Sequence, residues 1–274
     1  MFYAIAKNKI DLRGYRFEHR LEDIQTLNER AVRGELHISA ISIHAYAYVA
    51  DKYALLPCGA SMGDGYGPIV VGKHQTPNAE HRTSNSEADA REFLRDRIIA
   101  VPGRMTSAFL TLQLFLKRSF KHIVVPFDQI FDAIKEGRAD AGLIIHEGQL
   151  TYARSGLQKI VDLGEWWKCE TSLPLPLGGN VVRKDIPRNV RHDLLKIIRQ
   201  SIDYGLAHRD EAVEHSMPYA RDMNTELTGK FIGMYVNGYT RNYGEVGRAA
   251  IRKFLGEAQG AGHIGHRFEI EFVE

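Results

Sequence analysis

Short runs of apolar residues alternate with segments of helical periodicity along most of the chain. Apolar side chains recur at the i, i+3, i+4, i+7 spacing of a helix with one buried face at Phe127, Ile130, Phe131 and Ile134. The run from Asp140 to Ile145 is instead apolar throughout after its first residue, which is typical of a strand covered on both faces. This alternation predicts an α/β protein with largely parallel sheets.

Two series of strands and helices predict that the chain folds into two lobes. On this division residues 1–74 and 184–274 form a larger, discontinuous lobe, and residues 95–183 form a smaller inserted α/β lobe. Residues 75–94 form a polar crossover between them. Because the carboxyl ends of strands in open parallel sheets form the binding crevice, ligand is expected in a cleft between the lobes.

Charge and composition exclude several broad classes of protein. The 274 residues include 36 Lys and Arg against 34 Asp and Glu, a formal net charge of +2 that argues against a dedicated binder of nucleic acid or of an anionic membrane. Hydrophobic residues make up 44% and charged residues 26%, which is the composition of a globular protein rather than of a disordered one. The expected partner is therefore a small molecule.

The cysteines and the N-terminal residues predict a cytoplasmic protein. Cys58 and Cys169 have no motif partner and no zinc spacing, so neither a disulfide nor a metal site is expected. Residues 1–9 lack the basic start and the apolar run of a secretion signal. No apolar run approaches the ~20 residues of a membrane span.

Residues 58–68 are rich in glycine and invite comparison with a phosphate-binding loop. A loop of that kind follows a strand and ends in Gly-Lys-Ser/Thr at the start of a helix, whereas these glycines precede a strand, and His74 follows Gly72-Lys73. The segment is therefore expected to be a turn at which the backbone closely approaches a ligand or a neighbouring element.

Polar side chains follow strands at three places where the chain would face the crevice. His146 comes directly after the apolar run, and a free imidazole, with a pKa of about 6.5, exchanges protons near neutrality. Thr106 and Ser107 open a helix, whose first N–H groups and positive dipole end can hold a carboxylate. The third place is the junction of strand and helix at Ser39-Ala40-Ile41-Ser42.

Each of these groups has a purely structural alternative. A histidine at a strand end can be held by a backbone carbonyl, and the residues by themselves favour this interpretation of His146 over a catalytic one. Thr106 or Ser107 can simply cap the helix that follows it. Ser42 can likewise cap the helix predicted over 43–53, while Ser39 stays in its strand. The sequence shows no nucleophile elbow and no pair of catalytic carboxylates, so covalent catalysis is not expected.

Five strings occur together in one protein family, and in this sequence they are Val101–Arg104, Ala141–Glu147, Val161–Trp167, Leu173–Gly178 and Tyr235–Asn237. The chain resembles this family, the 1,4-dihydroxy-6-naphthoate synthases of menaquinone biosynthesis by the futalosine route. The resemblance extends from Phe2 to about Ala258. It rests on the combination of the strings rather than on any one of them.

The resemblance implies a fold, a reaction and a set of site residues. The fold is the two-lobed fold of type II periplasmic binding proteins, without their export signal. The reaction converts cyclic dehypoxanthine futalosine to 1,4-dihydroxy-6-naphthoate with release of a small sugar fragment, so the chain would be a carbon–carbon lyase acting on a small aromatic carboxylate, and no cofactor is implied. By motif, His146 is the proton acceptor, and Ser39-Ala40-Ile41 and Thr106-Ser107 contact the substrate.

Two other functions remain open. One is a non-catalytic binding protein for an aromatic acid, since the same fold also serves solute capture. The other is chorismate dehydratase, the sister enzyme of the same fold, against which the His146-Glu147 string argues. Family members usually begin with a strand and a polar loop ahead of Phe2, so one wall of the cleft is expected to be missing here. The oligomeric state and any assistance of His146 by Glu147 also stay open.

Overall fold

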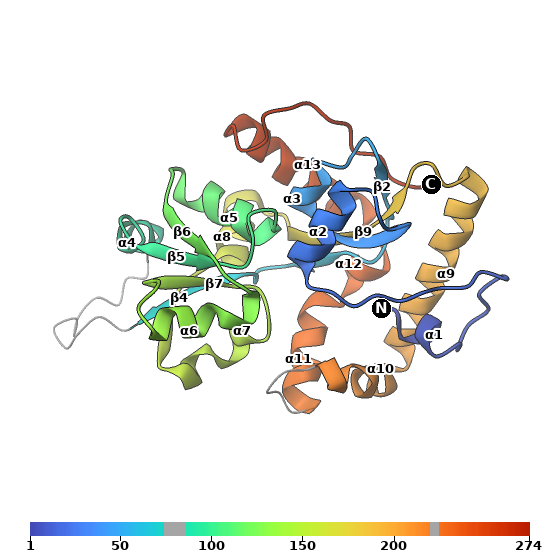
Figure 1. The fold of residues 1–274 in the computed structure, drawn as a ribbon, viewed down its shortest axis with the longest axis horizontal. Coiled ribbons are helices and arrows are strands. Elements are labelled where there is room, and N and C mark those ends of the chain that lie inside the picture. The colour runs from blue at the N-terminus through green and yellow to red at the C-terminus, as the bar shows by residue number, and fades with distance from the viewer. Residues whose placement is uncertain (74–85, 220–224) are drawn as a thin grey trace.

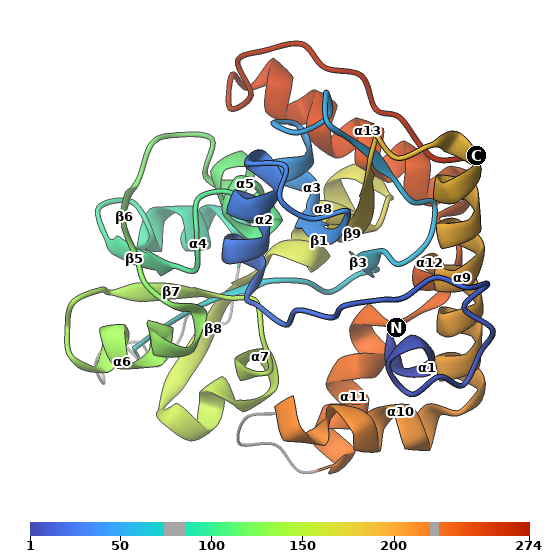
Figure 2. The same cartoon turned by 45° about the vertical axis from the view of Figure 1, so that its right-hand side comes forward.

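Two β-sheets with helices packed around them make up the fold in a computed structural model, which describes residues 1–73, 86–219 and 225–274 (Figure 1). The five-stranded sheet lies with α4 (Glu87–Phe93) and α6 (Ile130–Lys135) on one side of the molecule. On the other side lie α9 (Arg188–Ala207), α10 (Arg209–Ser216) and α11 (Thr225–Tyr235), while α13 (Gly244–Gly260) runs along the top of the molecule in both views (Figure 2). Of the predicted crossover 75–94, residues 75–85 lie outside the described residues, and α4 occupies most of the remainder.

The four-stranded sheet is antiparallel wherever its strands pair. Its strand order is β1 (Ile38–Ser42), β9 (Leu175–Arg183) and β2 (Tyr53–Leu55), and β3 (Ser61–Gly63) pairs with a further part of β9. The expectation of largely parallel sheets is therefore wrong for this sheet. Long chain excursions separate β1 and β2 from β9 in sequence, and the alternation of strands and helices alone does not say in which direction such strands pair.

The five-stranded sheet is mixed. Its order is β6 (Lys121–Val124), β5 (Ile98–Val101), β7 (Ala141–Ile144), β4 (Ile69–Lys73) and β8 (Leu157–Asp162). Strand β5 is parallel to both of its neighbours, as the alternation of strands and helices in this region predicts. Strand β4 is antiparallel to β7 and to β8, so the parallel arrangement is limited to the β6-β5-β7 part.

The two sheets divide the chain differently from the predicted lobes. Strand β4 belongs with β5 in the five-stranded sheet, although it falls within the predicted segment 1–74. Strand β9 belongs with β1 and β2, although it falls within the predicted segment 95–183. The chain therefore passes between the sheets in the glycine-rich segment before β4 and just before β9, rather than in the polar segment that the composition singled out.

The sequence predicts a turn over 173–179 and a strand only over 180–183, but β9 already begins inside the Leu-Pro-Leu-Pro part of that turn. Proline normally interrupts a strand because it donates no backbone hydrogen bond. Pro176 is tolerated because it pairs with Met62 next to a break in the register between β3 and β9. The opposite difference occurs after Ser42, where the sequence predicts one helix over 43–53 but α3 spans only Ile43–Tyr46.

Helices pack around both sheets. The remaining ones are α1 (Tyr3–Ala6), α2 (Ile24–Val32), α5 (Ser107–Leu116), α7 (Gly148–Thr151), α8 (Leu163–Thr171) and α12 (Gly238–Arg241), with 3₁₀ turns at Phe127–Gln129, Tyr152–Ser155 and Met217–Tyr219. Buried side chains of α5, α8 and α13 form one core with those of both sheets. In the part of the chain that the structure describes, no helix combines the length and apolar character needed to cross a membrane.

Candidate functional site

A cavity of about 300 Å³ lies where the two sheets meet. Its wall comes from the end of β1, from β9, from the start of α5, from the end of β7 and from α11. The lining residues are Met1, Ile24, Ala40, Ile41, Ser42, Gly59, Ser61, Pro68, Thr106, Ser107, Ala108, Ile145, Gln149, Leu177, Gly178, Gly179, Asn180, Phe231 and Tyr235. The volume is at the lower end of the usual range for small-molecule sites.

The cavity brings together two of the three predicted junctions. Ala40, Ile41 and Ser42 line it together with Thr106 and Ser107, although more than 60 residues of chain separate the two groups. The sequence argument that strand ends and helix starts meet at one crevice therefore holds for these segments. Two further predicted site residues, Ser39 and His146, are not among the lining residues.

Ser39 and His146 contact other parts of the protein instead of the cavity. Ser39 is buried in β1, and its hydroxyl donates to the carbonyl of Ala40 at 2.7 Å. The ring of His146 packs edge-on against Phe127, with ring centres 5.4 Å apart, while its neighbours Ile145 and Gln149 line the cavity. His146 therefore directly follows a residue that lines the cavity, but its own ring lies against Phe127.

The hydroxyls of Thr106 and Ser107 are used inside the protein. Thr106 Oγ1 donates to the carbonyl of Gly103 at 2.9 Å and accepts from the N–H of Phe109 at 3.1 Å, which makes it the cap of α5. Ser107 Oγ donates to the carbonyl of Leu177 at 2.6 Å and accepts from the N–H of His44 at 3.1 Å. Since the N–H of Phe109 is bound by this cap, the N–H groups of Ser107 and Ala108, rather than the two hydroxyls, are the donors at this helix start that suit a carboxylate.

Ser107 acts as a bridge between the helix and the four-stranded sheet, so its replacement tests a structural role. Ser107→Ala leaves two buried backbone groups without their partner, and we expect the free energy of unfolding to fall by about 1–3 kcal/mol. Denaturant unfolding measures this loss. Ser39→Ala is the matched control, because its hydroxyl bonds only to the adjacent residue, and a smaller loss is expected there. An equal loss in both variants would contradict the bridge.

Asn28 holds the first junction in place, a role for which the sequence carries no signal. Its Oδ1 accepts from the N–H of Ser42 at 2.8 Å, and its Nδ2 donates to Ser42 Oγ at 3.0 Å. Ser42 therefore stands at the N-cap position of α3 without capping it by its side chain. An isolated asparagine in an amphipathic helix carries no periodic signal, which is why only the contact reveals its role.

Gln149 and Tyr235 join the two sides of the cavity. Gln149 Nε2 donates to the carbonyl of Ile144 at 3.2 Å, and its Oε1 accepts from the hydroxyl of Tyr235 at 2.6 Å. Burial raises the pKa of Tyr235 well above its usual value, so this hydroxyl stays protonated and serves as a donor. The pair connects the end of β7, just before His146, to α11.

His44 supports the start of α5 from behind the cavity. Its Nδ1 lies 3.3 Å from the carbonyl of Thr106, so this nitrogen carries the proton and donates it. The side chain is 4% exposed, and burial lowers the pKa of His44 to about 4. The neutral ring is therefore part of the folded structure at neutral pH.

The shifted pKa of His44 predicts a loss of stability in mild acid. Between pH 6.5 and pH 4 the unfolded chain binds a proton at this residue and the folded chain does not, so the free energy of unfolding falls as the pH is lowered through this window. The contribution amounts to about 2–3 kcal/mol. Urea unfolding of wild type and of His44→Asn at pH 7.5 and pH 4.5 measures it, with the exposed His19→Asn as control. A pH dependence that is the same in all three proteins would contradict the assignment.

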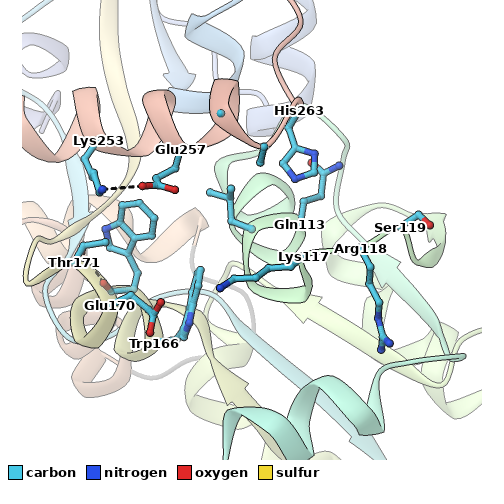
Figure 3. A pocket seen from close by; sticks show the side chains of 14 residues that line it. Gln113, Lys117, Arg118, Ser119, Trp166, Glu170, Thr171, Lys253, Glu257 and His263 are labelled. Carbon is cyan, nitrogen blue, oxygen red and sulfur yellow. Dashed lines mark hydrogen bonds and ion pairs between the residues drawn. The ribbon is translucent and has the colours of Figure 1, made fainter.

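A larger hollow of about 630 Å³ lies elsewhere, among α5, α8 and α13 (Figure 3). Trp166 and Glu170 form one side of it, and Lys253 and Glu257 on α13 form an ion pair 2.7 Å long across another. None of the residues that the sequence singled out as substrate contacts lines this hollow. Helix α5 connects the two sites, with its start at the smaller cavity and its end at the hollow.

Groups of three or more His, Cys, Asp or Glu side chains that could hold a metal ion do not occur among the described residues. Cys58 is buried, and burial raises the pKa of its thiol to about 11, while Cys169 is exposed. Both are free thiols in the structure. The polar groups that the described wall of the cavity presents are the start of α5 and side chains such as Gln149, Asn180 and Tyr235.

Comparison with solved structures identifies the class of fold. The ligand-binding component of an import system from Staphylococcus aureus superposes with a TM-score of 0.66 at 11% identity, over 96% of this chain and 89% of that one. At this identity the likeness concerns the fold alone. It confirms the expected α/β fold of the periplasmic-binding-protein type.

Sequence comparison identifies the family. Residues 1–259 match the profile of a family described as menaquinone biosynthesis. A 1,4-dihydroxy-6-naphthoate synthase of Thermus thermophilus is 36% identical over 262 residues, which cover 96% of this chain and 90% of that protein. A crystal structure of an Archaeoglobus fulgidus protein superposes with a TM-score of 0.86 at 42% identity, over 96% of this chain and 93% of that one. The chain belongs to the menaquinone biosynthesis family, and the resemblance seen in its sequence is confirmed.

Proposed function

We propose that the chain is a carbon–carbon lyase that converts cyclic dehypoxanthine futalosine to 1,4-dihydroxy-6-naphthoate. The observation that carries this proposal is the identity with a synthase of that name over nearly the whole of both chains. The cavity supports it, since the two segments expected to contact the substrate, Ala40–Ser42 and Thr106–Ser107, both line it. A cytoplasmic location and a reaction without cofactor stay predictions from the sequence.

The start of α5 is the proposed site for the substrate carboxylate. This ten-residue helix begins at Ser107, and Ala108 lines the cavity beside it. Because Thr106 accepts the N–H groups of Phe109 and Leu110, the N–H groups of Ser107 and Ala108 are the ones left for a ligand, and the helix dipole favours a negative charge there. Because Thr106 and Ser107 fix the turn through their own hydrogen bonds, the donors are held in place before the ligand arrives.

His146 is the proposed general base. The substrate's sugar-derived ring must lose a proton as a carbon–carbon bond breaks, and the formation of an aromatic second ring supplies much of the driving force. Tyr235, the titratable side chain on the described wall, is a protonated donor and cannot accept this proton at neutral pH. The imidazole of His146 lies on the adjoining turn, between Ile145 and Gln149, which line the cavity.

The geometry of His146 sets a condition on this role. Its Nδ1 accepts the N–H of Gly148 at 3.0 Å, so in the neutral ring the proton sits on Nε2. To act as base, the ring must turn from Phe127 and Phe131 toward the cavity and release its Nδ1 lone pair from Gly148. Glu147, whose Oε2 lies 3.9 Å from Nδ1, can then stabilise the imidazolium that forms.

The test of the proposed function is incubation of the purified protein with cyclic dehypoxanthine futalosine, followed by mass detection of 1,4-dihydroxy-6-naphthoate. Formation of this product without added cofactor is expected. The fold likeness to a ligand-binding component favours one second candidate, a non-catalytic binder of an aromatic carboxylate. Tight binding without turnover would favour that candidate and overturn the enzyme proposal.

A further inference from the structure

Asn180 is a buried amide on the wall of the cavity that the sequence treated only as part of a strand. It lies in β9 opposite Ala40, one of the predicted substrate-contact residues. Its side chain is 1% exposed. Its backbone carbonyl accepts from the N–H of Leu56 at 2.8 Å, so the main chain at this position has its partner.

The two ends of the Asn180 amide differ in their surroundings. Nδ2 points at Gly59, to whose carbonyl it donates a long hydrogen bond of 3.4 Å. Gly59 has a φ of +78°, and a Cβ there would overlap Nδ2, so glycine leaves room for the amide at this position. Oδ1 is buried and has no hydrogen-bond partner among the described residues. Turning the amide over would set Oδ1 against the carbonyl of Gly59, which fixes the orientation.

A buried amide oxygen without a donor is unusual in a folded protein, because it loses its hydrogen bonds to water and gains none. The other polar side chains of the wall do not share this property. Both hydrogen-bonding functions of Gln149 are engaged inside the protein, and the hydroxyls of Thr106 and Ser107 each donate and accept there. Asn180 is thus a residue of the cavity wall whose amide oxygen is a buried acceptor without a donor among the described residues.

We propose that Asn180 binds the ligand of this cavity by accepting a hydrogen bond from one of its hydroxyl groups. An amide oxygen can only accept, so its partner is a donor, and a hydroxyl is the donor that a hydroxylated aromatic carboxylate carries. The helix start at α5 takes the carboxylate and Asn180 on β9 takes the hydroxyl. The inference rests on the proposed function for the identity of the ligand, but the binding geometry does not depend on turnover.

The experiment compares two ligands that differ in their hydroxyls. Calorimetry measures the Kd of 1,4-dihydroxy-6-naphthoate and of 2-naphthoate, which keeps the carboxylate and lacks both hydroxyls, for wild type and for Asn180→Leu. The wild type is expected to prefer the hydroxylated ligand, and the leucine variant to lose about 10- to 100-fold in affinity for it. The Kd of 2-naphthoate should change less than about threefold, since its carboxylate contact at α5 is unchanged.

Stability separates a ligand-binding role from a structural one. Leucine has nearly the shape of asparagine and removes an unpaired buried oxygen, so the Tm of Asn180→Leu is expected to equal or exceed that of wild type. A large drop in Tm, an equal loss for both ligands, or an unchanged preference for the hydroxylated ligand would each overturn the proposal. Asn180→Ala repeats the comparison of the two Kd values with a smaller side chain. A wild type that binds with this preference but does not convert the futalosine substrate would refute the proposed function and leave the role of Asn180 supported.

Discussion

Replacement of His146 by alanine is expected to lower kcat by about 10²–10⁴-fold, the usual contribution of a positioned acid–base group. The proposed substrate contacts at the start of α5 and on β9 do not involve this side chain, so KM should change little. Steady-state kinetics with cyclic dehypoxanthine futalosine measures both values. A thermal melt of each variant confirms that it is folded.

Two further variants separate base chemistry from the structural role of His146. Asparagine at this position can still accept the N–H of Gly148 through its side-chain oxygen, as in an Asx turn, but it cannot take up a proton near neutrality. His146→Asn is therefore expected to keep the fold and to lose as much kcat as the alanine variant. Glu147→Ala should cost less than either. A folded His146→Ala protein within a few-fold of wild type, or an active asparagine variant, would end the assignment of His146 as base.

The sequence predicts the kinds of elements better than their partners. The apolar run that ends at Ile145 is β7, and the parallel β6-β5-β7 part follows from the alternation of strands and helices. The pairing of β4 with β7 and β8, and of β9 with β1 and β2, depends on contacts between distant segments. The prolines at the start of β9 hid part of the strand, because their lack of a backbone donor normally argues against one.

Some residues of the candidate site could likewise be predicted from local signals, and others are revealed only by their contacts. The junctions at Ala40–Ser42 and at Thr106–Ser107 could be found because strand ends and helix starts carry local signals. The use of the Ser107 hydroxyl could not, since its acceptor is the carbonyl of Leu177, seventy residues away. Asn28, Gln149 and Asn180 were also missed. A buried amide has no periodicity and no motif of its own, and only its contacts distinguish it from a surface residue.

The glycine-rich segment before β4 packs closely against the start of α8. A close approach of the backbone to a neighbouring element was expected there, and the structure shows it: the segment lies against the start of α8. The N–H of Leu163 donates to the carbonyl of Pro68 at 2.9 Å, and Asp162 Oδ1 accepts from the N–H groups of Gly164 and Glu165. A Cβ at Gly164 would overlap the carbonyl of Tyr66 and the backbone nitrogen next to it.

Gly164→Ala is therefore expected to destabilise the protein by about 1–3 kcal/mol or more, because the obstructing atoms belong to the backbone and cannot rotate away. For a chain of this size the Tm should fall by several degrees, roughly 2–4 °C per kcal/mol. Since Pro68 lines the cavity, a shift of this segment should also raise KM.

Gly256→Ala in α13 is the matched control for this substitution. No described atom lies within 4 Å of a Cβ at Gly256, and alanine favours the helix over glycine by about 0.5–1 kcal/mol, so this variant should melt at or above the temperature of wild type. Calorimetric melts of the three proteins decide between the two effects. If the Tm of Gly164→Ala equals that of Gly256→Ala instead of lying below that of wild type, the glycine-rich segment before β4 can move away from α8 without loss of stability. Its contact with the helix then does not hold the wall of the cavity in place.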